Sequence, residues 1–368
     1  MSSEKVSRRE YLKYLGSFVA GLVIAGGGVA AYYTSLPSKE RVVKETVTTT
    51  VTVTKTVTVT PAPTPTLTPI KAKIIAGAGS TGGVFYYAQG ALAKVLSKYN
   101  PEIEVTVQVT GASVDNCKLL GLKKIDVGLA DSTIAYNAYH GIAHFKDVGK
   151  IPLRTIMAEY PSPLHLVTIE GIGINSVKDL VGKKVSIGGP GSATQELAPV
   201  MLKVYGITEK DFEAFPLDPT KSAEALKDRR IDAFFISFGV PAAAIKELCA
   251  TPGIKVKLIK YEKDKIEEFI KQFPPGLYFI YTLPAGTYPG IDYDIPMPAA
   301  AATLVCHADM DENLVYIITK TLIEHREEMA AIHPALKALS PEFAVSGSGI
   351  PFHPGAIKYY KEIGVWKE

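Results

Sequence analysis

Residues 71–89 read KAKIIAGAGSTGGVFYYAQ, the pattern of a short apolar strand, a turn of glycines and hydroxyls, and the start of a helix. The glycines let the backbone of the turn approach a bound group closely. The helix that follows directs unpaired N–H groups and the positive end of its dipole to the same place. The stretch therefore predicts an anion-binding turn at the carboxyl end of the first strand of an α/β domain.

The same turn satisfies the dinucleotide fingerprint GxGxxG, from Gly77 to Gly82. That fingerprint needs an acidic residue at the end of the next strand to hold a ribose hydroxyl. The next predicted strand, 104–110, ends in Val109 and Thr110, and no lysine completes a nucleotide P-loop after the turn. A carboxylate therefore fits the turn better than a polyphosphate does. A turn that serves chain geometry alone is the alternative.

Composition narrows the class of protein. The chain has 368 residues, of which 47% are hydrophobic, and its formal net charge of +3 arises from scattered acidic and basic residues. We expect two domains and no nucleic-acid partner. His140 and His144 have helical spacing but lack the glutamate of a zinc motif, so we expect no metal and no cofactor. The three cysteines, which follow no disulfide or metal spacing, are expected to be small core residues: Cys117, Cys249 and Cys306.

Residues 1–36 are predicted to be a twin-arginine-like signal or membrane anchor. Ser7-Arg8-Arg9 opens a sequence similar to the twin-arginine export signal, and an apolar run covers 14–33. The run has about the length that spans a bilayer, and no convincing cleavage site follows it. We expect an extracytoplasmic protein tethered to the cell membrane by this segment, with a cleaved signal as the alternative.

Residues 37–70 are predicted to be a stalk. Residues 46–60 are all threonine or valine except Lys55, and prolines alternate with small or hydroxyl residues over 61–69. Threonine and valine favour extended backbone, prolines stiffen it, and neither segment can build a core alone. Such a spacer holds a folded domain away from a membrane.

From residue 71 onward, strands and helices alternate, which predicts a mostly parallel sheet flanked by helices. Ligands of such sheets bind at the carboxyl ends of the strands. Asp131 and Ser132 follow the third strand, and Ser113 is expected to cap the helix before it. The expected strands are 74–76, 104–110 and 125–130, and the expected helices are 84–99 and 113–123. In the first helix, the spacing lets Tyr87, Leu92, Val95 and Leu96 share one face.

A second unit follows two prolines, at 161 and 163, and is expected to open with a strand at 164–169. Its strand at 184–187 leads into another glycine-hydroxyl turn, 188–194, and then a helix at 195–205. LGLKKIDVGLADS at 120–132 is echoed by LKDRRIDAFFISF at 226–238, which makes Ser237 the counterpart of Asp131. Two such turns facing one cleft would suit a small acid. Ser192 with Gln195 also fits a capping box, which would commit the serine hydroxyl to backbone instead.

The rest of the chain completes this arrangement. Trp366 is expected to pack in the core rather than to line the cleft. The expected elements are an amphipathic helix at 262–273, a buried strand at 299–306, a long helix at 311–332 and a closing helix at 354–365.

Five segments in this order resemble the TAXI family of solute-binding proteins, the extracytoplasmic receptors of one class of TRAP transporter. The resemblance spans 74–365, and the segments are GAGSTGGVFYYAQGALAKVLS, VTGASVDNCKLLGLKKIDVGLADSTIAYNAYHG, VKDLVGKKVSIGGPGSAT, ALKDRRIDAFFISFGVPAAAI and PAGTYPG. It implies a two-lobed periplasmic-binding-protein fold of the Venus-flytrap type, type II. Lobe I would comprise 71–163 plus 303–368, and lobe II 164–302.

The resemblance also implies a function without catalysis. The lobes would close on glutamate, glutamine or a small dicarboxylate and deliver it to a sodium-coupled TRAP membrane subunit. The expected ligand-binding residues lie in the two turns and at the ends of two strands: Gly79, Ser80, Thr81, Gly82, Tyr86, Asp131, Ser132, Gly191, Ser192, Thr194 and Ser237.

One departure from the family favours an amino acid as the ligand. The family commonly has Gln-Ser-Asp where this chain has Asp131-Ser132-Thr133. A carboxylate at 131 can receive a ligand ammonium, unless it only caps the next helix, 133–139. No arginine stands at the predicted positions, so N–H groups, hydroxyls and helix dipoles are expected to hold ligand carboxylates. A stalked surface sensor of the same fold and, less favoured, a dinucleotide-dependent oxidoreductase are the alternative functions.

Overall fold

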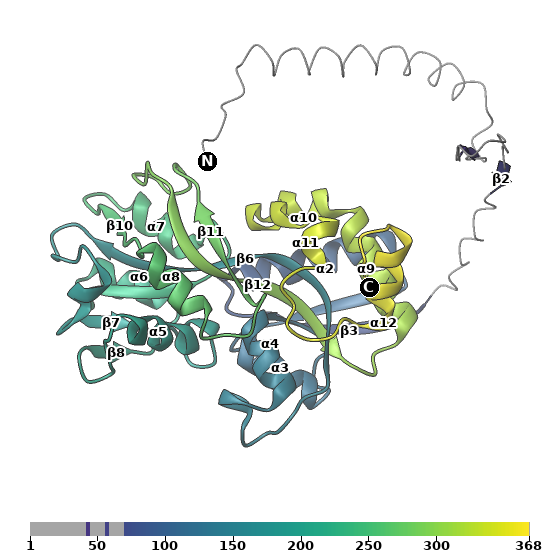
Figure 1. The fold of residues 1–368 in the computed structure, drawn as a ribbon, viewed down its shortest axis with the longest axis horizontal. Helices are drawn as coiled ribbons and strands as arrows, with labels where there is room; N and C mark the ends of the chain where they lie inside the picture. The colour runs from purple at the N-terminus through teal and green to yellow at the C-terminus, as the bar shows by residue number, and fades with distance from the viewer. Residues whose placement is uncertain (1–41, 45–55, 59–69, 368) are drawn as a thin grey trace, which may run out of the picture. The chain divides into compact units, whose positions relative to one another are not determined.

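The computed structural model describes residues 42–44, 56–58 and 70–367 (Figure 1). The predicted signal or anchor at 1–36 lies outside the described residues, as does most of the predicted stalk. Within the stalk, two short strands, β1 (Val42–Lys44) and β2 (Thr56–Thr58), pair antiparallel. Residues 68–368 form one compact unit. In the described part of the chain, no helix combines the length and apolar character needed to cross a membrane.

The first parallel part of this unit contains the opening stretch. β3 (Ala72–Gly77) runs parallel to both β4 (Ile103–Gln108) and β5 (Val127–Asp131) and lies between them. The connecting helices are α2 (Val84–Tyr99) and α3 (Ser113–Gly121). The predicted alternation of strands and helices is therefore confirmed here, and α2 has the predicted ends.

Two local predictions in this part are wrong. Tyr87 does not share the buried face of α2; it is 39% exposed and stacks on His333, with 5.4 Å between the ring centroids. Ser113 does not cap α3, because Ala112, with a φ of 74°, is the cap residue and Ser113 is already helical. Its hydroxyl instead accepts a hydrogen bond from the backbone N–H of Asp131, at 3.1 Å.

The second parallel part repeats the first. β7 (Lys184–Ser186) lies between β8 (Glu213–Phe215) and β9 (Ala233–Ser237) and is parallel to both. Its helices are α5 (Ala193–Val204) and α6 (Pro219–Lys227). β5 ends at Asp131 and β9 ends at Ser237, so the internal echo in the sequence corresponds to equivalent strand ends.

Two long strands join the parts. β6 (Leu153–Ile169) and β12 (Ile295–His307) pair antiparallel through the centre of the molecule, where β12 also pairs with β5 and β6 with β9 (Figure 1). The result is a ten-stranded sheet with the path β4-β3-β5-β12-β6-β9-β7-β8, to which β10 (Val256–Leu258) and β11 (Tyr278–Leu283) add at the sides. Both long strands extend well before the predicted starts at 164 and 299, since prolines that indicate a break lie inside them. The predicted lobe boundaries stay a prediction.

Helices cover both parts (Figure 1). The predicted long helix at 311–332 is wrong: α9 (Glu312–Glu324) and α10 (Arg326–Ile332) meet at His325, which leaves the helical conformation and stacks on Tyr99. The apolar period continues through this break, so the pattern does not reveal it. Among the residues that the structure describes, the remaining helices are α4 (Ser132–His140), α7 (Ala243–Ala250), α8 (Lys263–Ile270), α11 (Pro341–Ala344), α12 (Pro354–Glu362) and three 3-10 turns, Ala143–Phe145, Val177–Leu180 and Pro334–Ala338.

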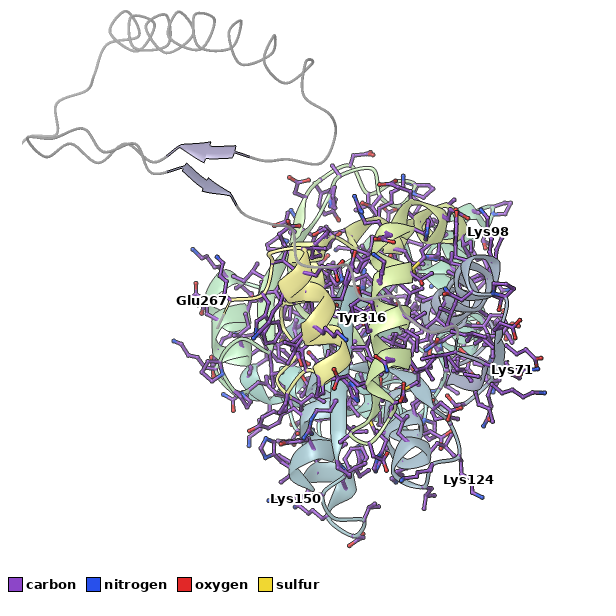
Figure 2. The ribbon with its side chains drawn as sticks, turned by 90° about the vertical axis from the view of Figure 1, so that its right-hand side faces the viewer. Lys71, Lys98, Lys124, Lys150, Glu267 and Tyr316 are labelled. Atoms are coloured by element: carbon purple, nitrogen blue, oxygen red, sulfur yellow. The ribbon has the colours of Figure 1, made fainter. Side chains whose placement is uncertain are left out.

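Core and surface follow the usual division. Cys117 and Cys306 are buried and Cys249 is half-buried. Trp366 packs on Tyr360, with nearly parallel rings. The labelled lysines lie at separate places on the surface (Figure 2): Lys71, Lys98, Lys124 and Lys150.

Candidate ligand-binding site

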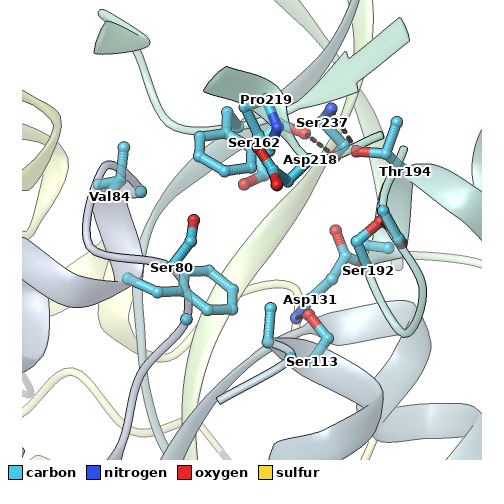
Figure 3. A pocket seen from close by; sticks show the side chains of 18 of the residues that line it. Ser80, Val84, Ser113, Asp131, Ser162, Ser192, Thr194, Asp218, Pro219 and Ser237 are labelled. Carbon is cyan, nitrogen blue, oxygen red and sulfur yellow. Dashed lines mark hydrogen bonds between the residues drawn. The ribbon is translucent and has the colours of Figure 1, made fainter. Parts of the chain in front are cut away.

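A cavity of about 290 Å³ lies between the two parallel parts (Figure 3). Its walls are the first glycine turn with the start of α2, the start of α3, the second glycine turn with the start of α5, and the start of α6. The ends of β5 and β9 and the middle of β6 complete it. The site thus lies at strand carboxyl ends, as expected for this class of sheet.

The structure brings only part of the predicted site together. The predicted residues that line the cavity are Gly79, Ser80, Asp131, Ser192, Thr194 and Ser237; those that do not are Thr81, Gly82, Tyr86, Ser132 and Gly191. Gly82 lies beside α6, where an added Cβ would come within 3.3 Å of the Thr220 hydroxyl. The Gly191 carbonyl accepts from the Val114 N–H at 3.1 Å, so this part of the turn contacts α3.

Asn116 fixes the first turn. Its side-chain amide donates to the carbonyls of Ala78 and Leu129, both at 2.7 Å. The Thr110 hydroxyl lies within 2.7 Å of the Asn116 amide oxygen, which makes the turn part of a connected network. No described side chain caps α2, whose first residues, Val84 and Phe85, line the cavity and, like those of any helix, have N–H groups without an intrahelical acceptor.

The second turn is built around Ser192, whose hydroxyl accepts from the Gln195 N–H at 3.3 Å and donates to the Gly189 carbonyl at 2.7 Å. The capping alternative raised by the sequence is therefore what this hydroxyl does in the structure. Gly188 is required for the turn, because its φ is 96° and an added Cβ would lie 2.6 Å from that of Thr194.

Thr194 and Ser237 connect the second turn to the strands. The Thr194 hydroxyl accepts from the Ser237 N–H at 2.9 Å, and the Ser237 hydroxyl donates to the Ser162 carbonyl at 3.4 Å (Figure 3). Both hydroxyls thus hold the cavity wall in place.

Asp131 is the acid at the floor of the cavity. One carboxylate oxygen, Oδ1, accepts from the Thr133 N–H at 3.0 Å and so caps α4. The other oxygen, Oδ2, has no partner among the described residues, although the residue is only 2% exposed. Burial raises the pKa of Asp131 to about 7; the bond from Thr133 opposes this, and the charge of Glu196 adds to it. The helix cap therefore uses one oxygen and leaves the second for another partner.

Sequence reasoning missed several residues of the cavity wall. Tyr160 and Ser162 belong to β6, in a segment that precedes the predicted strand start at 164. Asp218 caps α6 and pairs with Lys221, with 2.9 Å between carboxylate oxygen and ammonium nitrogen. Aspartate followed by proline is a helix-start signal, so Asp218-Pro219 could have indicated this element.

The two parallel parts also contact each other beside the cavity. The Asn137 amide donates to Glu196 Oε2 at 3.2 Å, and His144 Nε2 lies 3.5 Å from Glu196 Oε1. His140, the other member of the histidine pair, packs against Tyr136 instead. No group of metal-ligating side chains occurs among the described residues.

The chain is similar to several solved structures. A structure of PhnD1 from Prochlorococcus marinus in complex with methylphosphonate has a TM-score of 0.51 at 11% identity and covers 80% of this chain and 96% of its own. The periplasmic aliphatic sulphonate binding protein SsuA from Escherichia coli has a TM-score of 0.44 at 16% identity, covering 79% and 83%.

A substrate binding protein of an ABC uptake transporter from Streptococcus pneumoniae with bound histidine has a TM-score of 0.45 at 17% identity, covering 73% of this chain and 95% of its own. Residues 76–364 match the NMT1-like family. The chain therefore belongs to the NMT1-like family and has the fold of a periplasmic substrate-binding domain.

Proposed function

We propose that the chain is the extracytoplasmic solute-binding receptor of a TRAP-type transporter and captures a small carboxylate. A glutamate- or glutamine-like amino acid is favoured, and a small dicarboxylate comes next. The observation that carries the amino-acid choice is that Asp131, whose Oδ2 has no partner among the described residues, lines the same cavity as the starts of α2 and α5.

The site offers separate partners for the two charges of an amino acid. The first N–H groups of α2 and α5, at Val84, Phe85, Ala193 and Thr194, suit a carboxylate. The free oxygen of Asp131 suits an ammonium, and hydrogen bonds to charged groups contribute about 1.5–3 kcal/mol each. Lys221 is already paired with Asp218. A zwitterion therefore matches the cavity better than a dianion does.

Closure of the two parts would deliver the ligand. We infer hinge motion about the long strands, near 161–166 and 299–306, with the ligand stabilising the closed form through contacts to both parts. The Glu196 contacts to Asn137 and His144 would form on closure. The TRAP partner rests on the TAXI resemblance of the sequence, and export with tethering rests on the N-terminal segment. An ABC-type permease is the alternative partner.

Mass spectrometry of small molecules released from the denatured protein tests the proposal. We expect an amino acid, and calorimetry should then show tighter binding of L-glutamate or L-glutamine than of succinate. Succinate binding without amino-acid binding would contradict the ammonium assignment. Bound dinucleotide would revive the oxidoreductase alternative, and the absence of transporter genes beside this gene would favour the sensor.

A further inference from the structure

We propose that Tyr160 donates a hydrogen bond to the ligand's α-carboxylate, so that Tyr160 and Asp131 together recognise the amino-acid end of the ligand. This inference rests on the proposed function and extends it to a residue that the sequence did not indicate. It defines which end of the ligand lies at the centre of the sheet.

The Tyr160 hydroxyl lacks a partner. Tyr160 lies in β6, is one of the residues that line the cavity and is fully buried, and its hydroxyl makes no hydrogen bond to any described residue. Buried polar groups are almost always paired, because the unpaired state has a large desolvation cost. A ligand in the cavity would supply the missing acceptor.

The ring of Tyr160 is held in one place by close packing. Gly239, just after β9, also lines the cavity, and an added Cβ there would lie 2.7 Å from Cε2 of the Tyr160 ring. The backbone of the second parallel part thus lies directly against the ring. Tyr160 pairs with Ala302 of β12, next to the inferred hinge segment, so the hydroxyl is presented from a paired strand rather than from a loop, which favours a defined geometry toward the ligand.

The electrostatic surroundings make this hydroxyl a donor. Burial raises the pKa of Tyr160 well above its usual value, and the charges of Glu159 and Asp131 act in the same direction. The phenol therefore keeps its proton. In an α-amino acid, the ammonium and the carboxylate are bonded to the same carbon atom. When the ammonium binds Asp131, a neutral donor on the adjacent wall therefore suits the carboxylate.

Position in the cavity distinguishes Tyr160 from other tyrosines. Tyr261 and Tyr278 are also buried with hydroxyls that have no partner among the described residues, yet neither lines the cavity. Tyr261→Phe is the better matched control, since it removes the same kind of hydroxyl away from Asp131. The charge of Asp131 contributes to the raised pKa of Tyr278, so Tyr278→Phe would be a control less independent of Asp131.

Calorimetry on Tyr160→Phe tests the assignment. The probes are whichever of L-glutamate and L-glutamine binds the wild type more tightly, and the amine that results from its decarboxylation. We expect Tyr160→Phe to weaken amino-acid binding about tenfold to a hundredfold. Binding of the decarboxylated amine should change less than twofold, and Tyr261→Phe should leave both unchanged. The melting temperature of ligand-free Tyr160→Phe should not fall, because the hydroxyl is unpaired without ligand.

Other results overturn the assignment in distinguishable ways. Unchanged amino-acid affinity in Tyr160→Phe removes Tyr160 from the site while leaving the proposed function intact. Equal losses for the amino acid and the amine assign the hydroxyl to another group than the α-carboxylate. Failure of the wild type to bind either amino acid overturns the proposed ligand class, and this inference with it.

Discussion

Binding of an amino acid should release protons from Asp131. Burial raises the pKa of this carboxyl to about 7, so close to half of the ligand-free molecules are protonated at neutral pH. An ammonium bound at Oδ2 favours the charged form, and the carboxyl then loses its proton. We expect about 0.5 proton released per ligand at pH 7, about 0.9 at pH 6 and about 0.1 at pH 8.

The same linkage sets the pH dependence of affinity. Below pH 7 the affinity should fall nearly tenfold per pH unit, and above pH 8 it should level off. Calorimetry in buffers of different ionisation enthalpy measures the number of protons directly. Asp131→Asn keeps the acceptor that caps α4 but cannot ionise, so this variant should bind more weakly and show no proton release from this position.

Glu196, near the cavity, also has a shifted pKa, and the variant separates its protons from those of Asp131. The pKa of Glu196 is raised, chiefly by burial, while the charge of His144 and the bond from Asn137 lower it. Proton release that persists unchanged in Asp131→Asn would come from Glu196. That result, or the absence of any buffer dependence in the wild type between pH 6 and 7, would refute the ammonium assignment.

Two further predictions concern residues whose packing is known. Thr194→Val should weaken ligand binding roughly fivefold, because it removes the acceptor of the Ser237 N–H, whereas Thr81→Ala, outside the cavity, should bind normally by calorimetry. Glu159 is fully buried without a partner in the described part of the chain, and burial raises its pKa to about 8 from an ordinary 4.5. The folded state therefore holds this proton more tightly than the unfolded state, and stability falls as pH rises from about 5 to 8. Glu159→Gln should remove that fall and stabilise the protein at pH 8 by up to about 5 kcal/mol in urea unfolding, and an unchanged pH profile would contradict the assignment.

The sequence predicts the ends of helices and strands correctly where a local signal, such as a glycine turn or a proline, coincides with the end that the fold requires. Helix 84–99 was predicted at its observed ends because a glycine turn precedes it and Asn100-Pro101 follows it. The strand ends at Asp131 and Ser237 were found through the internal echo. Prediction failed where tertiary contacts decide the backbone, as at His325, where α9 and α10 separate although the apolar period continues.

The candidate site divides in the same way. The sequence pattern identifies the glycine turns but not the direction in which each of their side chains points. Thr81 and Tyr86 are therefore expected in a cavity that they do not line. Tyr160 gave no signal, because a tyrosine beside prolines in an apolar run is not distinguishable from a core residue. Its importance comes from its place in β6 at the cavity wall, which only the fold determines.

Asp131 shows why capping and ligand binding need not exclude each other. From the sequence alone, a helix cap at 131 would remove the argument that this carboxylate binds a ligand ammonium. The structure separates the two roles by atom, since Oδ1 accepts from Thr133 and Oδ2 accepts from no described residue. The cap fixes the carboxyl plane, and burial keeps water from the second oxygen, so each role supports the other. An acid placed at a strand end for local reasons thus becomes a preorganised partner for a cation that enters the cavity.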